Sequence, residues 1–353
     1  MAPGTALVWG TGLIGGSIAL ALSAAKWDVR VADRDETKTR QVAENLQLRQ
    51  LSEDFDPDCV VIATPPSSVA LSIKELIKLY PESTFIDVAS VKNKVINDVE
   101  TDLGKLSNFV PSHPMAGKET SGSLSASFDL MLDRRWIVTP LSYTDPKHIE
   151  AAENLIVDCG ATPLLSSPDV HDSAVAVTSH LPQILASGLA SMLLGKDPQE
   201  VSMSGGGLRD MTRLAKSAPD LWEQILLSNK LQVVESLDVF IDKLTSIKNA
   251  LASNKHVAVR EFIAAGNEAL GLLPGKHGDT TRDLDVVGVM IDDKPGQLAE
   301  LFSVLAQISL NIEDVRINHA LGREIAIVEL YVAQGDGDIA RNHLNQRGWM
   351  IRH

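Results

Sequence analysis

This chain of 353 residues is poor in cysteine, in aromatic side chains and in positive charge. Its two cysteines, Cys59 and Cys159, lack metal-ligand spacing, so we expect no metal site and a reducing, cytoplasmic compartment. The net charge of −14 argues against general nucleic-acid binding, which depends on basic surfaces. Residues 1–25 lack the basic segment typical of a signal peptide, and no run of about 18 apolar residues predicts a membrane span.

Short β-prone segments alternate with helical segments over residues 1–166. This alternation is typical of the α/β class, in the form of a Rossmann-type doubly wound parallel sheet. From residue 167 to 274 the β-prone segments disappear and helical patterns predict an all-α domain. A linker containing glycine and proline follows at 272–279, and β-prone segments return over 281–353. We therefore expect three domains, with boundaries near residues 166 and 274–280.

A glycine-rich motif follows the first β-prone segment and opens a helical stretch. Its spacing, with Asp33 placed 18 residues after Gly15, is typical of a dinucleotide site. Glycines permit a tight turn and let the backbone approach a pyrophosphate at a helix N-terminus. Asp33 would bind the ribose hydroxyls of NAD and repel the 2′-phosphate of NADP, whereas the adjacent Arg34 leaves NADP possible. The candidate cofactor-binding residues are Gly10, Gly12, Leu13, Ile14, Gly15, Asp33, Arg34, Thr64 and Pro65.

One histidine stands at the predicted end of a strand. His113 precedes Pro114, and the residue before a proline prefers extended backbone. Open α/β sheets place their chemistry at the carboxyl ends of the strands, where His113 and Ser90 would both face the cofactor. A neutral imidazole can accept a proton near pH 7, which makes His113 a candidate base, although an isolated histidine is more often structural or merely exposed.

The helical segment carries two further histidines. His171 and His180 are nine residues apart, which places them on opposite faces of a straight α-helix. Pro182 would bend the helix and could re-aim its neighbours, or one of the histidines could make a purely structural contact. Residues 221–253 predict one long amphipathic helix whose apolar stripe belongs to the core or to a homodimer interface.

A basic cluster, Arg209-Asp210-Met211-Thr212-Arg213, follows three glycines at 205–207. Arg209 and Arg213 share a helical face at the spacing i, i+4, and Asp210 can pair with Arg213. The cluster is therefore either a surface ion-pair ladder or an anion site, since arginine binds carboxylates through two parallel hydrogen bonds. In a protein of negative net charge, an anionic ligand requires such a local cluster.

Taken together, these motifs resemble the prephenate/arogenate dehydrogenases of tyrosine biosynthesis, over about residues 5–265. The segments that carry the resemblance are Gly10-Thr11-Gly12-Leu13-Ile14-Gly15-Gly16-Ser17, Asp87-Val88-Ala89-Ser90-Val91-Lys92, His113-Pro114-Met115-Ala116-Gly117 with Glu119, His171-Asp172 with Ser179-His180-Leu181-Pro182, and Arg209-Asp210-Met211-Thr212-Arg213 with Trp222. The resemblance implies oxidation of the ring C4 hydroxyl of prephenate by hydride transfer to a nicotinamide. The ring would lose CO2 as it becomes aromatic.

The resemblance also implies roles for single residues. His113 would accept the proton of the C4 hydroxyl, Ser90 would orient His113 and touch the hydroxyl and the nicotinamide, and Arg213 would hold the ring carboxylate. Some prephenate-preferring members carry a second histidine that contacts the substrate side chain, and this chain has Gln183 there, so the choice between prephenate and arogenate stays open. Further substrate-binding or supporting residues would be Glu119, His171, His180, Asp210 and Trp222.

Residues 281–353 predict the order βαββαβ, a ferredoxin-like unit. The turn after its first strand and the start of its next strand resemble an ACT domain, an amino-acid-sensing module. The resemblance implies feedback by tyrosine, bound between neighbouring domains, and a degenerate dimerisation domain that binds nothing is the alternative. The implied effector-binding residues are Asp293, Pro295, Gly296, Asn311 and Ile312.

Two other functions fit the same sequence. An NAD(P)-dependent dehydrogenase of a small hydroxy acid would share the nucleotide site but would release no CO2. An amino-acid-binding regulator could keep a vestigial nucleotide fold, although an intact set of His113, Ser90 and Arg213 argues against it.

Overall fold

The computed structural model describes residues 3–117, 122–273, 284–308, 310–319 and 325–352. The chain divides into two compact units, Met1–Ser246 and Ile247–His353. The predicted substrate residue Glu119 lies outside the described residues. Among the helices that are described, none is both long and apolar enough to cross a membrane.

An eight-stranded sheet forms the centre of the first unit, in the order β3-β2-β1-β4-β5-β6-β7-β8. Neighbouring strands run parallel, except for the antiparallel pair of β6 and β7. The predicted α/β class and doubly wound sheet are thus confirmed, but the antiparallel pairing and the short β3 were not predicted. The strands are β1 (Thr5–Trp9), β2 (Asp28–Ala32), β3 (Arg49–Gln50), β4 (Cys59–Ile62), β5 (Thr84–Asp87), β6 (Phe109–Pro114), β7 (Arg135–Val138) and β8 (Thr162–Leu165).

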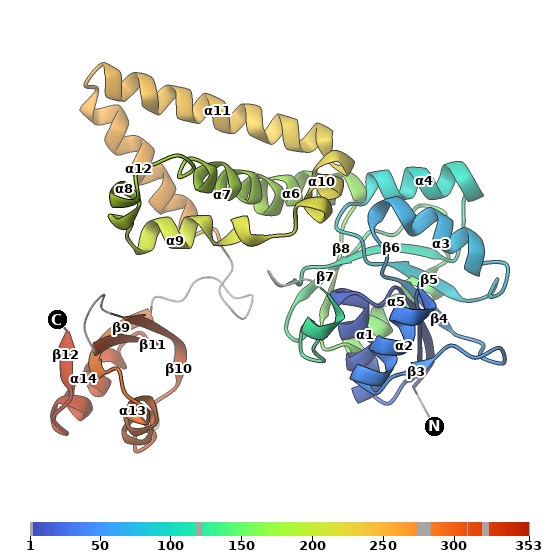
Figure 1. The fold of residues 1–353 in the computed structure, drawn as a ribbon, viewed down its shortest axis with the longest axis horizontal. Coiled ribbons are helices and arrows are strands. Elements are labelled where there is room, and N and C mark those ends of the chain that lie inside the picture. Colours follow the sequence, from blue (N-terminus) through green and yellow to red (C-terminus); the bar gives the residue numbers. More distant parts are fainter. Residues whose placement is uncertain (1–2, 118–121, 274–283, 309, 320–324, 353) are drawn as a thin grey trace. The chain divides into compact units, whose positions relative to one another are not determined.

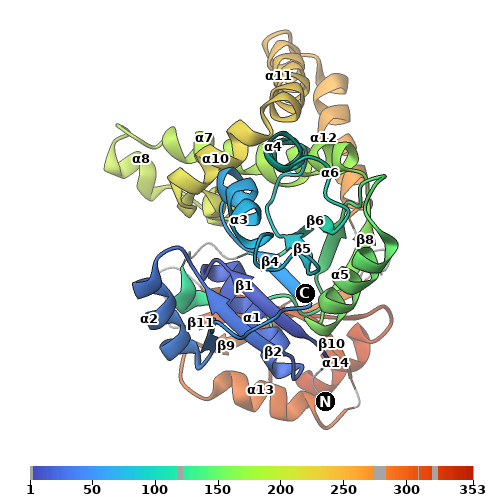
Figure 2. The same ribbon diagram turned by 90° about the vertical axis from the view of Figure 1, so that its right-hand side faces the viewer.

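Helices cover both faces of this sheet (Figures 1 and 2). Successive residues of β1 alternate between two buried clusters, with Ala6 and Val8 in one and Leu7 in the other. A strand covered on both faces reads as a continuous apolar run, which is why the central strands were recognisable in the sequence. The helices of this part are α1 (Leu13–Ala24), α2 (Glu36–Leu46), α3 (Val69–Leu76), α4 (Asn93–Leu103) and α5 (Pro146–Asp158).

The reversal at β7 follows from the connection that precedes it. Between β6 and β7 the described residues contain a 3-10 turn, Ser123–Ser125, and no α-helix. Two parallel neighbours need a crossover, usually through a helix, whereas antiparallel neighbours do not. Strand β7 therefore returns beside β6 in the opposite direction, and α5 then carries the chain to β8, which is parallel to β7.

The rest of the first unit is helical, and its last helix continues past Ser246 into the second unit. The expected single helix over residues 221–253 was wrong, because the backbone of Asn229 (φ −114°, ψ 28°) ends one helix and the next begins after it. Apolar residues lie on both sides of this break, at Leu227 and Leu231, so the stripe alone did not reveal it. The elements are α6 (Pro168–Val175), a π-helical turn (Ala176–His180), α7 (Leu181–Ser191), α8 (Pro198–Ser202), α9 (Gly206–Thr212), a 3-10 turn (Arg213–Lys216), α10 (Pro219–Ser228) and α11 (Lys230–Ala252).

The second unit contains a four-stranded antiparallel sheet in the order β10-β11-β9-β12. The predicted succession βαββαβ is confirmed, with β9 and β11 adjacent at the centre of the sheet. Its core is built from apolar side chains such as Val287, Leu301, Val328 and Leu344. The elements are α12 (His256–Leu270), β9 (Leu284–Asp292), α13 (Gln297–Leu305), β10 (Ile312–His319), β11 (Ile325–Ala333), α14 (Gly337–Asn345) and β12 (Met350–Arg352).

Candidate active site

The glycine-rich loop joins β1 to α1 through contacts that exclude larger residues. Gly10 has a φ of +106°, and a Cβ there would lie 2.5 Å from the carbonyl oxygen of Ala63. A Cβ on Gly15 would lie 1.9 Å from the carbonyl oxygen of Gly10, so α1 packs directly against the loop. Gly12 has open space around its Cα and caps α1 without a side-chain hydrogen bond. The N-terminal N–H groups of α1 can therefore bind an anion such as a pyrophosphate.

Polar groups of the predicted cofactor residues lie next to this loop. The Asp33 carboxylate accepts hydrogen bonds from Thr11 N at 2.9 Å, Thr11 Oγ1 at 3.0 Å and Lys38 Nζ at 2.9 Å. Burial alone would raise the pKa of Asp33, but the bonds from Thr11 and Lys38 lower it. The buried hydroxyl of Thr64 has no hydrogen-bond partner among the described residues. An ionised acceptor and an unpaired buried hydroxyl fit a polar ligand such as a dinucleotide.

The other predicted cofactor residues surround the same loop. They are Leu13 and Ile14, half-buried in the first turn of α1, Arg34, exposed next to Asp33, and Pro65, exposed after β4.

His113 lies at the carboxyl end of β6, as the sequence predicted. Its ring is half-buried, and its Nδ1 lies 2.8 Å from Nε2 of His171. The two rings meet edge to face, with centroids 5.1 Å apart. Burial, together with the nearby His171 and Lys92, holds the pKa of His113 well below its usual value. His113 is therefore neutral near pH 7 and able to accept a proton.

The neighbouring carboxylate of Asp172 holds His171. Nδ1 of His171 lies 2.8 Å from Oδ1 of Asp172, and both side chains are buried. The same carboxylate accepts hydrogen bonds of 2.8 Å from the backbone N–H groups of Lys92 and Asn93, where α4 begins. Burial by itself would raise the pKa of Asp172, but these hydrogen bonds lower it, so the group is ionised. Helix α6 thus supplies the charged cap of α4.

His180 belongs to the same buried region. The amide of Asn229 donates to the carbonyl oxygen of Asp172 at 2.8 Å and lies 3.2 Å from Nδ1 of His180. The ring of His180 meets Trp222 edge to face, with centroids 6.1 Å apart. Burial lowers the pKa of His180 to about 4.

The sequence left the relative orientation of His171 and His180 open, because only a straight helix would place them on opposite faces. Both are buried, with 3% and 1% of their surfaces exposed. The intervening π-helical turn contains more residues per turn than an α-helix, so each residue rotates the chain by less. Over nine residues the net rotation is therefore smaller than the two and a half turns of a straight α-helix.

An ion pair is buried under the end of β6. Nζ of Lys92 donates to the Asp87 carboxylate and to the carbonyl oxygen of Ser112, the residue before His113, and both charged side chains are 0% exposed. Asp87 also accepts from the backbone N–H groups of Ala89 and Ser112. Sequence analysis gave no role to Lys92, because lysine is ordinarily a surface residue. Its position five residues after a strand-end aspartate was the one available signal.

The predicted substrate residues are not all in one place. Ser90 is half-buried in the segment that follows β5, and Asp210 is exposed on α9. Arg213 is exposed at the start of the 3-10 turn that follows α9. Gln183 is buried, and its amide is engaged by the residues of that turn, donating to the Leu214 carbonyl oxygen at 3.0 Å and accepting from Ser217 Oγ at 3.2 Å.

The predicted effector residues belong to the second unit. The connection from β9 to α13 contains Asp293, Pro295 and Gly296, and Gly296 has a φ of +94°. The side-chain amide of Asn311, just before β10, donates to Glu313 Oε1 at 2.7 Å, and Ile312 begins the strand.

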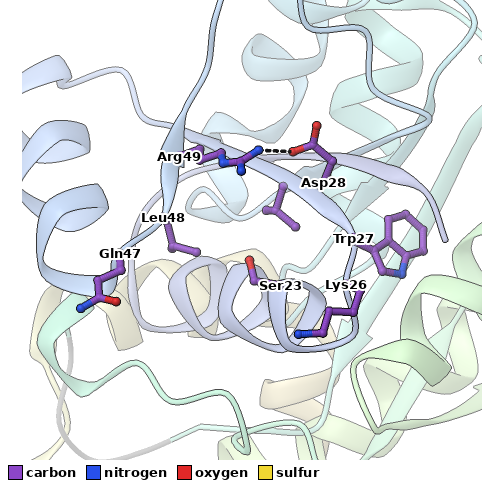
Figure 3. Close-up of a pocket in the computed structure, with 8 residues that line it drawn as sticks. Ser23, Lys26, Trp27, Asp28, Gln47, Leu48 and Arg49 are labelled. Atoms are coloured by element: carbon purple, nitrogen blue, oxygen red, sulfur yellow. Dashed lines mark hydrogen bonds and ion pairs between the residues drawn. The ribbon is translucent and has the colours of Figure 1, made fainter. Parts of the chain in front are cut away.

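A hollow of about 380 Å³ lies away from these residues (Figure 3). It is formed by the end of α1 and the starts of β2 and β3, and an ion pair of 3.4 Å between Arg49 and Asp28 borders it. This is the edge of the sheet opposite to the glycine loop, because Asp28 begins β2 whereas Gly10 follows the end of β1. The hollow therefore carries none of the predicted catalytic residues.

Two successive segments of the chain match known protein domains. The sequence model of the prephenate dehydrogenase nucleotide-binding domain matches residues 18–165. That of the prephenate dehydrogenase dimerization domain matches residues 167–264.

Characterised relatives are similar over most of the chain. Prephenate dehydrogenase of Bacillus subtilis is 30% identical, over 89% of this chain and 88% of the relative. Cyclohexadienyl dehydrogenase of Zymomonas mobilis is 32% identical, over 76% of this chain and 95% of the relative. The crystal structure of A. aeolicus prephenate dehydrogenase in complex with hydroxyphenyl propionate and NAD+ is 28% identical and has a TM-score of 0.69, covering 77% of this chain and 99% of that one. The chain belongs to the prephenate dehydrogenase family of oxidoreductases.

Proposed function

We propose that the protein is an NAD-dependent prephenate dehydrogenase of tyrosine biosynthesis, which converts prephenate to 4-hydroxyphenylpyruvate and CO2. The observation that carries this proposal is the position of His113. It is a neutral, half-buried imidazole at the carboxyl end of β6, the edge of the sheet at which the glycine loop also lies. Open α/β sheets bind their ligands at this edge.

The protein's own groups would act on the substrate alcohol. The glycine loop and Asp33 would hold NAD, whose nicotinamide would supply the hydride acceptor for C4 of the ring. His113 accepts the proton of the C4 hydroxyl as the carbon is oxidised, a contribution of about 10² to 10⁴ in rate. The ring carboxylate then leaves as CO2 and the ring becomes aromatic. Ser90, in the segment that follows the neighbouring strand β5, would contact the hydroxyl.

Charged residues would select the substrate and the cofactor. Arg213 would hold the ring carboxylate through paired hydrogen bonds, with Asp210 and Trp222 supporting its helix and pocket. The ionised Asp33 favours NAD, because it can accept bonds from ribose hydroxyls and would repel a 2′-phosphate. Lys38 and Arg34 lie next to Asp33, so measurement with NADP is a necessary comparison.

Arogenate is the second candidate substrate, and Gln183 supports considering it. Its uncharged amide is hydrogen-bonded to Leu214 and Ser217, so it supplies no positive charge for the pyruvyl side chain of prephenate. The cyclohexadienyl dehydrogenase among the relatives carries a name that does not specify one substrate.

The assay that tests this function measures NADH formation at 340 nm and CO2 release with prephenate, and repeats both with arogenate and with NADP. We expect equal amounts of NADH and CO2, with prephenate and NAD as the best pair. NADH without CO2 would indicate a dehydrogenase of a simple hydroxy acid. Binding of the ligands without turnover would indicate a vestigial nucleotide fold.

For the second unit we propose an ACT-like regulatory role in a cytoplasmic homodimer. The glycine turn at Gly296 and the position of Asn311 just before β10 support a site for tyrosine, shared with a neighbouring copy. Apolar residues exposed on α11, such as Leu231, Val234 and Leu244, support dimerisation through the helices. Deletion of residues 281–353 should abolish inhibition by tyrosine and leave turnover intact. Inhibition that persists would place tyrosine in the active site.

A further inference from the structure

The hydrogen-bond chain from Asp172 through His171 to His113 has a direction, because its first member is ionised. A carboxylate only accepts hydrogen bonds, so the proton between Asp172 Oδ1 and His171 Nδ1 belongs to the histidine. In a neutral His171, Nε2 then carries a lone pair and accepts. With Nε2 of His171 as the acceptor, the proton in the 2.8 Å contact with His113 lies on Nδ1 of His113.

We propose that Asp172 and His171 are positioning residues that hold His113 as its Nδ1–H tautomer, so that its Nε2 is the base for the substrate hydroxyl. The inference rests on the proposed function, to which it adds the atom that takes the proton. When Nε2 accepts the hydroxyl proton, His113 becomes a cation that still donates through Nδ1 to His171. The negative charge of Asp172, one residue further along, stabilises that cation.

Two features of the structure favour a dedicated chain over an incidental contact. The side chains of His171 and Asp172 are each 1% exposed, so water does not compete for their hydrogen bonds. The carboxylate is also fixed by the N–H groups of Lys92 and Asn93 at the start of α4. The carboxylate at the start of the chain is thus fixed by backbone groups, and it in turn orients the ring of His171.

The direct test reads the tautomer of His113 in the enzyme without substrate. With 15N-labelled histidine, NMR distinguishes a protonated ring nitrogen from an unprotonated one, and His113→Asn identifies the signals that belong to this residue. We expect Nδ1 protonated and Nε2 unprotonated at pH 8 in the wild type. A wild-type His113 that carries its proton on Nε2 overturns the proposal, whatever substrate the enzyme uses.

The second test compares variants of the two positioning residues. His171→Leu removes both hydrogen bonds and should lower kcat by about 10² or more, the lower end of the range for a lost positioned base. His171→Gln keeps one donor and one acceptor and should stay within about tenfold of the wild type. Asp172→Asn should increase the share of His113 protonated on Nε2 and lower kcat more than it changes the KM for NAD.

Controls separate positioning from folding. Asp169 is a second aspartate on α6 that joins it to α4, because it accepts a hydrogen bond of 3.1 Å from Asn93 Nδ2 at the surface. Asp169→Asn is therefore the matched control. It should leave kcat within about twofold of the wild type, because the chain to His113 is untouched. NADH binding shows whether each variant is folded. Equal kcat losses in His171→Leu and His171→Gln, with the tautomer unchanged in Asp172→Asn, would mean that the contact is only structural.

The failure of this inference is distinguishable from that of the proposed function. If wild-type enzyme does not oxidise prephenate, the function is wrong, but the tautomer measurement still stands on its own. If it does oxidise prephenate while His113 is protonated on Nε2, the function holds and the positioning role is wrong.

Discussion

Two buried aspartates, Asp87 and Asp172, are linked by hydrogen bonds to His113 or to the residue before it. Their negative charges are compensated in different ways. Asp87 pairs with the side chain of Lys92, which also donates to the carbonyl oxygen next to His113. Asp172 accepts from the backbone of the same lysine and from His171. Lys92 therefore joins the two carboxylates, one through its side chain and the other through its main chain.

The difference lies in where each hydrogen-bond network ends. Asp87 and Lys92 are fully buried and satisfied by each other and by backbone groups, so this pair ties the end of β5 to β6. Burial raises the pKa of Asp87 and lowers that of Lys92, so each charge depends on the other. The network of Asp172 instead ends on a half-buried imidazole. We therefore expect the first network to serve mainly stability and the second to serve turnover.

The largest effect that separates these roles is expected for His113→Asn. The variant keeps a polar side chain but loses the base, so kcat should fall by about 10² to 10⁴. Its free energy of unfolding and its affinity for NADH should change little. Turnover is followed at 340 nm and unfolding with urea.

An exposed histidine provides the control for this substitution. His256→Asn, at the start of α12, should behave as the wild type in both measurements. A near-normal kcat in His113→Asn would show that His113 is not the base. The proposed difference between the Asp87–Lys92 pair and the Asp172 network would then be wrong.

Lys92→Met should show the opposite balance, with stability as the main loss. Removing one member of a buried ion pair leaves an uncompensated charge, which costs about 3–5 kcal/mol. Urea unfolding followed by tryptophan fluorescence is suitable, because the indole of the buried Trp136 donates to Ser112 Oγ beside this pair. The double variant Asp87→Asn with Lys92→Met should be less destabilised than the sum of its single variants. Additive losses would show that the two side chains are not a coupled pair.

Local patterns in the sequence were enough to predict the nucleotide loop and the strand end that carries His113. Both are encoded within a few residues, by glycines that backbone contacts require and by a proline after the histidine. The βαββαβ order of the second unit was readable for the same reason, since its elements follow each other with clear turns. These features depend little on distant parts of the chain.

The surroundings of His113 could not be predicted, because they depend on contacts between distant segments. His171 reaches His113 across 58 positions of sequence, and the Asp172 carboxylate caps a helix 79 positions away. The π-helical turn and the break at Asn229 override the regular helical period on which the sequence argument relied. The direction of β7 was hidden too, because it follows from a connection whose described residues contain no α-helix.

As the pH falls, protonation of the buried histidines should lower the free energy of unfolding before protonation of the buried carboxylates does. The pKa of buried His180 is about 4, against about 6.5 in an unfolded chain. Since the folded pKa is the lower one, stability is unaffected above pH 6.5 and falls as the pH drops from there to 4, by about 3 kcal/mol for a shift of this size. His113, whose pKa is also lowered, acts in the same direction.

Asp172 has the opposite dependence on pH. Its folded pKa lies below the unfolded value of 3.8, so its contribution is complete above that pH and is lost only in stronger acid. Urea unfolding at pH 7, 6 and 5 should therefore show a loss that is smaller in His180→Asn. An identical slope in that variant would mean that His180 is not a buried neutral group.

The smallest effect is expected for Asn229→Ala, which cuts a side branch of the Asp172 network. The substitution removes the hydrogen bond to the Asp172 carbonyl oxygen and the contact with His180, and should cost about 1–3 kcal/mol of stability. Turnover should stay within about threefold, because the side chains of Asp172 and His171 keep their own bonds. Asn249→Ala, an exposed position on α11, is the control and should cost nothing. If Asn229→Ala reduced kcat as strongly as Asp172→Asn, the residues that support His113 in catalysis would include the break between α10 and α11. Stability and turnover would then depend on the same buried residues.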